Sequence, residues 1–153
     1  MTGVSDMTEV KAASVADVLE RELEPTIKEW LRRVNLVPEL AHTPLSDVDR
    51  MDHLPRLYHD LICRLRLGKD AKRLISTAAA MHGEIRYAQG YSAAMLVEES
   101  RVFQVATFGT LYRYESELDQ NQVLLDVMVI ADEVDAQLME AVRSLTRLAR
   151  LAA

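Results

Sequence analysis

The sequence contains few of the residues that build disulfide frameworks, turn-rich folds or large cofactor cavities. Its 153 residues include one cysteine, five glycines, four prolines, two phenylalanines and one tryptophan. A single cysteine excludes an internal disulfide, and the scarcity of glycine and proline argues against a β fold, which needs many tight turns. So few aromatic side chains also argue against a haem-binding cavity.

Strong positive charge and long apolar runs are missing as well. The net charge of −6 argues against a general nucleic-acid-binding surface. No apolar stretch approaches the ~20 residues that span a bilayer. Residues 1–13 lack the basic start and apolar run of a signal peptide. We therefore expect a cytoplasmic protein with no nucleic-acid or membrane partner.

Motifs of the common enzyme classes are also absent. The sequence has no phosphate-binding or dinucleotide-binding glycine loop, no zinc-protease motif and no nucleophile elbow. One Glu-x-x-His string ends at His42, but it lies in a proline-flanked connection rather than on a helix. His53, His59 and His82 lack the i, i+4 spacing of two ligands on one helix. We expect no catalytic activity, no metal site and no cofactor.

Alanine, leucine, glutamate and arginine are plentiful, and the apolar residues recur at helical spacing. Ser14 and Ser46 are expected to start helices, Pro25 to interrupt the first helix, and Gly68 to end one. The predicted fold class is an all-α helical bundle of one short and five main helices. The main helices are expected at about residues 14–34, 52–66, 70–89, 92–114 and 119–152.

The last predicted helix carries a regular apolar seam. Its apolar residues alternate spacings of 3 and 4 for four heptads, at Leu124, Val127, Ala131, Val134, Leu138, Ala141, Leu145, Leu148 and Ala152. We expect a flexible N-terminus (1–13), a helical core (14–118) and a long helix (119–153) that packs on the core and then extends into a homodimer. The dimer seam would be Leu138, Ala141, Leu145 and Leu148. The same pattern also fits an ordinary bundle helix.

The stretch 81–101 places polar side chains beside apolar helical faces. Leu74, Ala78, Met81, Ile85 and Ala88 predict the core-facing seam of one helix. His82, Arg86 and Gln89 run alongside that seam, and Glu99 projects from an apolar face of the next helix. An isolated buried carboxylate is very costly, so we expect Glu99 to be buried and paired, first with Arg86 and second with His82.

These polar residues allow two interpretations. In the first, they form a network that fixes the register of two packed helices. In the second, they line a small binding site, with His82, Arg86, Gln89, Tyr91 and Glu99 as the ligand-binding candidates.

Two short motifs in this part of the sequence carry a resemblance to a known family. They are His-Gly-x-x-Arg-x-x-Gln-Gly-Tyr at 82–91, followed by Leu-Val-Glu-Glu-Ser-Arg at 96–101, and Asp-His-Leu-Pro at 52–55, which leads into Leu57, Leu61 and Leu65. Together with Trp30 they resemble the N-terminal domain of RsbRD-type RsbT co-antagonist proteins, over roughly residues 15–115. One departure is Gln104, where the family often has arginine. The resemblance implies an all-helical input domain that precedes an output module in bacterial signalling proteins.

We therefore expect a non-catalytic sensory or regulatory input domain of a bacterial signal-transduction protein, of the stress-response or histidine-kinase type. It would transmit through its C-terminal helix to a downstream or partner signalling module. It would act as a homodimer and bind an unknown small-molecule ligand. The alternative is a structural dimerisation or scaffold domain with no ligand.

Overall fold

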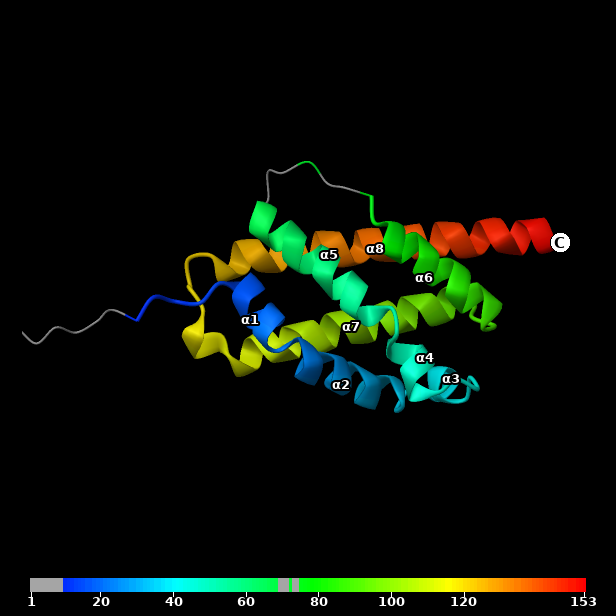
Figure 1. Ribbon diagram of the computed structural model, residues 1–153, viewed down its shortest axis with the longest axis horizontal. Coiled ribbons are helices and arrows are strands. Elements are labelled where there is room, and N and C mark those ends of the chain that lie inside the picture. The colour runs from blue at the N-terminus through cyan, green and yellow to red at the C-terminus, as the bar shows by residue number, and fades with distance from the viewer. Residues whose placement is uncertain (1–9, 69–71, 73–74) are drawn as a thin grey trace, which may run out of the picture.

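The computed structural model describes residues 10–68, 72 and 75–153, and every regular element in these residues is a helix (Figure 1). The helices are α1 (Val15–Arg21), α2 (Leu23–Val34), α3 (Pro38–Ala41), α4 (Asp47–Met51), α5 (Leu54–Leu67), α6 (Thr77–Ala88), α7 (Ala93–Arg113), a 3₁₀ turn (Glu115–Glu117) and α8 (Val123–Ala152). Apart from one isolated bridge between Ala13 and Leu118, the described residues form no β structure. The predicted all-α class is confirmed.

The two longest helices, α7 and α8, run side by side, and the shorter helices pack against them (Figure 1). The main partner of α6 is α8, whereas α2 packs mostly on α7, and α5 packs on α8 and α1. The last turns of α8 reach past the other helices (Figure 1). None of the helices in the described part of the chain has the length and apolar character needed to cross a bilayer.

Most of the predicted helix starts are confirmed. The hydroxyl groups of Ser14, Ser46 and Ser92 each accept a hydrogen bond from a backbone N–H in the first turn of α1, α4 and α7. The helical segment is interrupted at Glu22, between α1 and α2. Pro25 then lies in the first turn of α2, where its missing N–H costs little. Gly68 ends α5 with a φ of 80°, a conformation that favours glycine.

Three predicted boundaries were wrong. The segment expected to be irregular before Pro44 contains the short helix α3. The long helix begins at Val123 rather than at Asp119, because the Asp119 side chain accepts a hydrogen bond from Asn121 N and forms a turn instead. The helix expected from about Asp70 begins at Thr77, where Ser76 caps it. Asp70 itself lies outside the described residues.

The predicted core face of α6 was also wrong. Met81 and Ile85 are 47% and 41% exposed, whereas Ala79, His82, Gly83 and Arg86 are buried. The physical reason is that α6 lies very close to α8. A Cβ atom added at Gly83 would lie 2.1 Å from the backbone oxygen of Ala141. Small residues therefore form the contact, and the larger apolar side chains face outward. Ala88 is exposed and Ala78 half-buried, and Leu74 lies outside the described residues.

The predicted dimer seam on α8 packs within the chain itself. Ala141 and Leu145 are buried, and Leu138 and Leu148 are half-buried, on a helix whose main neighbour is α6. An alternation of 3 and 4 residues places side chains on one face, but it does not determine whether the partner helix belongs to the same chain. This face is therefore an ordinary bundle contact and not an exposed seam.

Candidate functional site

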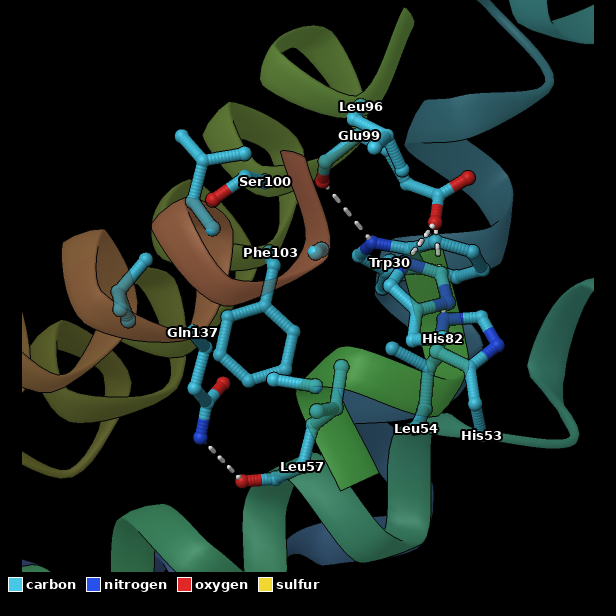
Figure 2. A pocket seen from close by; sticks show the side chains of 14 residues that line it. Trp30, His53, Leu54, Leu57, His82, Leu96, Glu99, Ser100, Phe103 and Gln137 are labelled. Carbon is cyan, nitrogen blue, oxygen red and sulfur yellow. Dashed lines mark hydrogen bonds and ion pairs between the residues drawn. The ribbon is translucent and has the colours of Figure 1, made fainter. Parts of the chain in front are cut away.

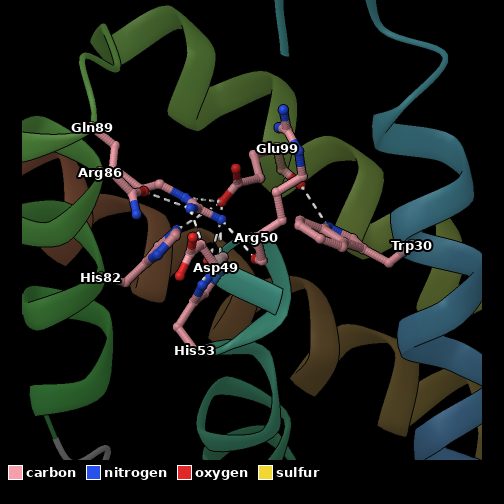
Figure 3. A network of polar contacts seen from close by, with 8 residues as sticks. All are labelled: Trp30, Asp49, Arg50, His53, His82, Arg86, Gln89 and Glu99. Atoms are coloured by element: carbon pink, nitrogen blue, oxygen red, sulfur yellow. Dashed lines mark hydrogen bonds and ion pairs between the residues drawn. The ribbon is translucent and has the colours of Figure 1, made fainter. Parts of the chain in front are cut away.

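A cluster of charged and aromatic side chains is buried where α6 and α7 meet the connection between α4 and α5 (Figure 3). We define the buried polar cluster as His53, His82, Arg86, Gln89 and Glu99. Arg86 is 0% exposed and Glu99 is 3% exposed. Burial of two charges is costly unless each has close partners, so the contacts of these two groups determine what the cluster can do.

The Arg86 guanidinium is the centre of the cluster. Its Nε donates to Glu99 Oε1 at 3.1 Å, its Nη1 to Gln89 Oε1 at 2.7 Å and its Nη2 to the Arg50 carbonyl oxygen at 2.8 Å. The Arg50 carbonyl belongs to the C-terminal turn of α4, where carbonyl groups lack helical partners. The Tyr91 ring lies 4.9 Å from Arg86 Cζ, a cation–π contact. Arg86 therefore ties α4, α6 and α7 together.

The Glu99 carboxylate is contacted mainly through one oxygen. His82 Nε2 lies 3.0 Å and His53 Nε2 lies 3.5 Å from Oε1, which Arg86 also contacts. Among the described residues, none hydrogen-bonds to Oε2, although that atom is buried. Burial opposes ionisation, but the hydrogen bonds from the two histidines and the positive charge of Arg86 outweigh it and hold the pKa of Glu99 well below its usual range. Glu99 is thus an anion.

His53 and His82 form a stacked pair beside this carboxylate. Their ring centroids are 3.7 Å apart, with 17° between the ring planes. The Trp30 and His53 rings are nearly perpendicular, with their centroids 6.2 Å apart, and Trp30 Nε1 donates to the Glu99 carbonyl oxygen at 3.4 Å. Burial, and then the nearby positive charges, lower the pKa of His53 to about 3. His53 is therefore neutral at ordinary pH and can act as a ligand through a ring nitrogen.

A cavity of about 30 Å³ lies beside the two histidines (Figure 2). One wall contains Trp30, His53, His82 and Glu99, and the opposite wall contains Gln137 and other residues of α8. This volume holds one or two water-sized groups, because one water needs about 10–15 Å³ by this measure. Pockets for drug-sized molecules are about 300–1,000 Å³. The cavity therefore fits water or an ion, and not a larger organic ligand.

The predicted candidates come together in space. His82, Arg86, Gln89 and Glu99 are linked by hydrogen bonds or ion pairs, and Tyr91 covers the guanidinium. The prediction that Glu99 is buried and bonded to Arg86 and His82 is confirmed. A ligand-binding role for the five residues stays a prediction. Of the five, only His82 and Glu99 line the cavity, and Arg86, Gln89 and Tyr91 do not.

Sequence reasoning missed two members of the site. His53 lies 29 positions before His82 and on another element, so no local spacing connects them. Trp30 belongs to α2. The available signal for both was the resemblance, which includes the Asp-His-Leu-Pro string and the tryptophan. Two residues of the predicted dimer seam, Leu138 and Ala141, instead line the cavity from α8.

The site combines two imidazoles and one anionic carboxylate beside a very small cavity, with a fixed guanidinium next to the carboxylate. Such a set can bind a cation or hold ordered water, and it can fix the relative positions of four helices. Comparison with known proteins adds nothing to this geometry, since no protein-family model, curated protein or solved structure matches the chain.

Proposed function

We propose that this chain is a non-catalytic sensory or regulatory input domain of a bacterial signal-transduction protein, of the stress-response or histidine-kinase type. In this proposal it works in the cytoplasm, and α8 carries its signal to a downstream or partner module. The observation that carries the proposal is the position of the cavity, which is lined both by members of the buried polar cluster and by residues of α8. The resemblance to RsbRD-type input domains supports the same function.

The proposed mechanism is a shift between two packings of the same helices. His53, His82 and Glu99 face the cavity from one side, and Gln137 and Leu138 face it from the other. A small ligand that contacts both walls changes the relative stability of the two packings by its difference in affinity for them. Since the last turns of α8 extend beyond the bundle (Figure 1), a displacement of this helix reaches a partner directly.

The second candidate is a structural dimerisation or scaffold domain with no ligand. The completeness of the contacts around Arg86 favours it, because every guanidinium nitrogen has a partner at 3.1 Å or less. A network of this kind fixes helix register without any signal. In both candidates a homodimer would use apolar side chains of α8 that remain exposed, such as Met139 and Leu151.

Amide hydrogen exchange distinguishes the regulatory domain from the scaffold domain. In the variant Glu99→Gln the buried anion is removed, and the regulatory proposal expects faster exchange in α8 from Leu138 to Ala152 than in α2. The matched control is Glu98→Gln, which alters the neighbouring carboxylate that pairs with Arg101 on the surface. It should leave exchange unchanged. A uniform loss of protection in all helices of Glu99→Gln would favour the scaffold.

A further inference from the structure

We propose that His53, His82 and Glu99 bind one divalent transition-metal ion, of the class that includes Zn²⁺. This inference rests on the proposed function, because it names the class of ligand for the same site. The three residues come from three separate elements: the α4–α5 connection, α6 and α7. Their ligand atoms all lie within 4.8 Å of one another. Two imidazoles and one carboxylate are a donor set that zinc uses in proteins.

The spacing of the donors suits one ion. Ligand atoms bound to a tetrahedral zinc at about 2.0–2.1 Å are about 3.3 Å from each other. Glu99 Oε1 lies 3.0 Å from His82 Nε2 and 3.5 Å from His53 Nε2. The three donors therefore lie near the spacing of ligands around one ion. To bind it, each Nε2 must present a lone pair in place of its N–H group, and the two stacked rings must tilt toward the ion.

The protein also provides the remaining features of such a site. The oxygen that lies close to both histidines is Glu99 Oε1, which also accepts from Arg86 Nε. The other oxygen, Oε2, is buried with no hydrogen-bond partner among the described residues, so the carboxylate keeps a second oxygen for the metal or its bound water. A carboxylate ligand that is itself hydrogen-bonded is held in a fixed orientation. The cavity of about 30 Å³ beside all three residues leaves space for a water molecule as the fourth ligand.

The positive charge of Arg86 limits the affinity of the site for a metal cation. Its guanidinium lies 3.1 Å from Glu99 and 3.5 Å from His53 Nδ1, so a second cation in the cluster is repelled. The carbonyl oxygens of Asp49 and Arg50 and the amide oxygen of Gln89 accept from this guanidinium and partly offset its charge. We therefore expect reversible binding, which suits a regulatory site, in place of permanent occupancy.

The experiment is a calorimetric titration of EDTA-treated full chain with Zn²⁺. One competing site must be removed first, since Cys63 Sγ and His59 Nε2 lie 3.5 Å apart on the exposed face of α5. The variant His59→Gln/Cys63→Ser removes that pair. We expect it to bind one Zn²⁺ per chain, and we expect His82→Gln in the same background to weaken binding at least tenfold. Replacing exposed His42 by Gln is the matched control and should change nothing.

A second measurement does not depend on any buried substitution. Crystals of the unaltered protein grown with Zn²⁺ should show an anomalous-scattering peak bonded to His53, His82 and Glu99. Loss of all binding in the His59→Gln/Cys63→Ser variant, or a peak at the surface alone, would overturn the inference. Unaltered binding in a folded His82→Gln variant would do the same.

The results also separate this inference from the proposed function. If Zn²⁺ binds at the cluster but leaves hydrogen exchange in α8 unchanged, the metal site stands and the regulatory proposal fails. If Zn²⁺ does not bind but Glu99→Gln selectively loosens α8, the regulatory proposal stands and the metal inference fails.

Discussion

The imidazole rings of His53 and His82 stack with their centroids 3.7 Å apart, although 29 positions separate the two residues in sequence. Two such rings in contact inside a protein are stable together when they are not both charged. The shared neighbour is Glu99, whose anion attracts donors from both rings. The histidine pair and the carboxylate therefore depend on one another, and the contacts that join α6 and α7 to the α4–α5 connection depend on all three.

The first prediction concerns the buried ion pair. Arg86→Met leaves Glu99 without its main cation and should lower the free energy of unfolding by about 3–5 kcal/mol, measured by urea denaturation. The exposed pair of Arg101 and Glu98 provides the control, since Arg101→Met should cost less than about 1 kcal/mol.

A double variant tests the cause of this loss. Arg86→Met combined with Glu99→Leu removes both charges, and it should regain part of the stability lost in the single variant. A double variant less stable than Arg86→Met alone would contradict the assignment of the cost to an unpaired carboxylate.

The second prediction uses two glycines in helices. Gly83→Ala should destabilise the protein by about 1–3 kcal/mol or more, because the new Cβ would lie 2.1 Å from the Ala141 backbone oxygen and would push α6 away from α8. Gly109 in α7 has nothing within 4 Å of an added Cβ, and Gly109→Ala should stabilise by about 0.5–1 kcal/mol. Thermal unfolding of both variants checks the contrast, and equal effects of the two changes would refute the close approach of α6 to α8.

The fold was largely predictable from local signals, while the site was only partly predictable. Ser14, Ser46 and Ser92 act within one helical turn, so their capping roles follow from sequence. Which face of α6 is buried depends instead on Ala141, far along the chain. Apolar periodicity therefore favoured Met81 and Ile85, but close helix packing selected the face that carries Gly83.

The functional residues show the same contrast between contacts that are local in sequence and contacts between distant parts of the chain. The link from Arg86 to Glu99 was predictable because a buried carboxylate needs a cation and few were near in sequence. The place of His53 in the cluster was not, because it depends on how the α4–α5 connection meets α6. The seam on α8 was predicted to join two chains, but it packs mainly on α6 of the same chain, because sequence spacing gives no means to identify the partner helix.

The third prediction concerns the pH dependence of stability in the metal-free protein. His53 has a pKa of about 3 when folded, below its value of 6.5 in the unfolded chain, so the unfolded state binds more protons between these limits. Its contribution to stability is complete above pH 6.5 and is lost progressively as the pH falls. Glu99, whose folded pKa is also depressed, loses its contribution in the same direction below about pH 4.5.

Urea denaturation between pH 4.5 and 7 in EDTA measures this dependence. The free energy of unfolding should fall toward low pH with a limiting slope of about 1.4 kcal/mol per pH unit for His53. The slope should be smaller in His53→Gln. Exposed His42 provides the comparison, since His42→Gln should keep the full slope. An unchanged slope in His53→Gln would show that another group is responsible.

The last prediction concerns self-association through α8. Leu145 is 6% exposed and packs inside the bundle, so Leu145→Asp should destabilise the fold and cannot report on a dimer. Leu151 is 79% exposed, and with Met139 it lies along a hollow on the C-terminal part of the helix. Exposed apolar side chains along one hollow favour contact with another protein surface. We expect the wild-type chain to be a dimer by light scattering, and Leu151→Asp to be a monomer with an unchanged melting temperature. A wild-type monomer at high micromolar concentration would show that this end of α8 does not join two copies of the chain.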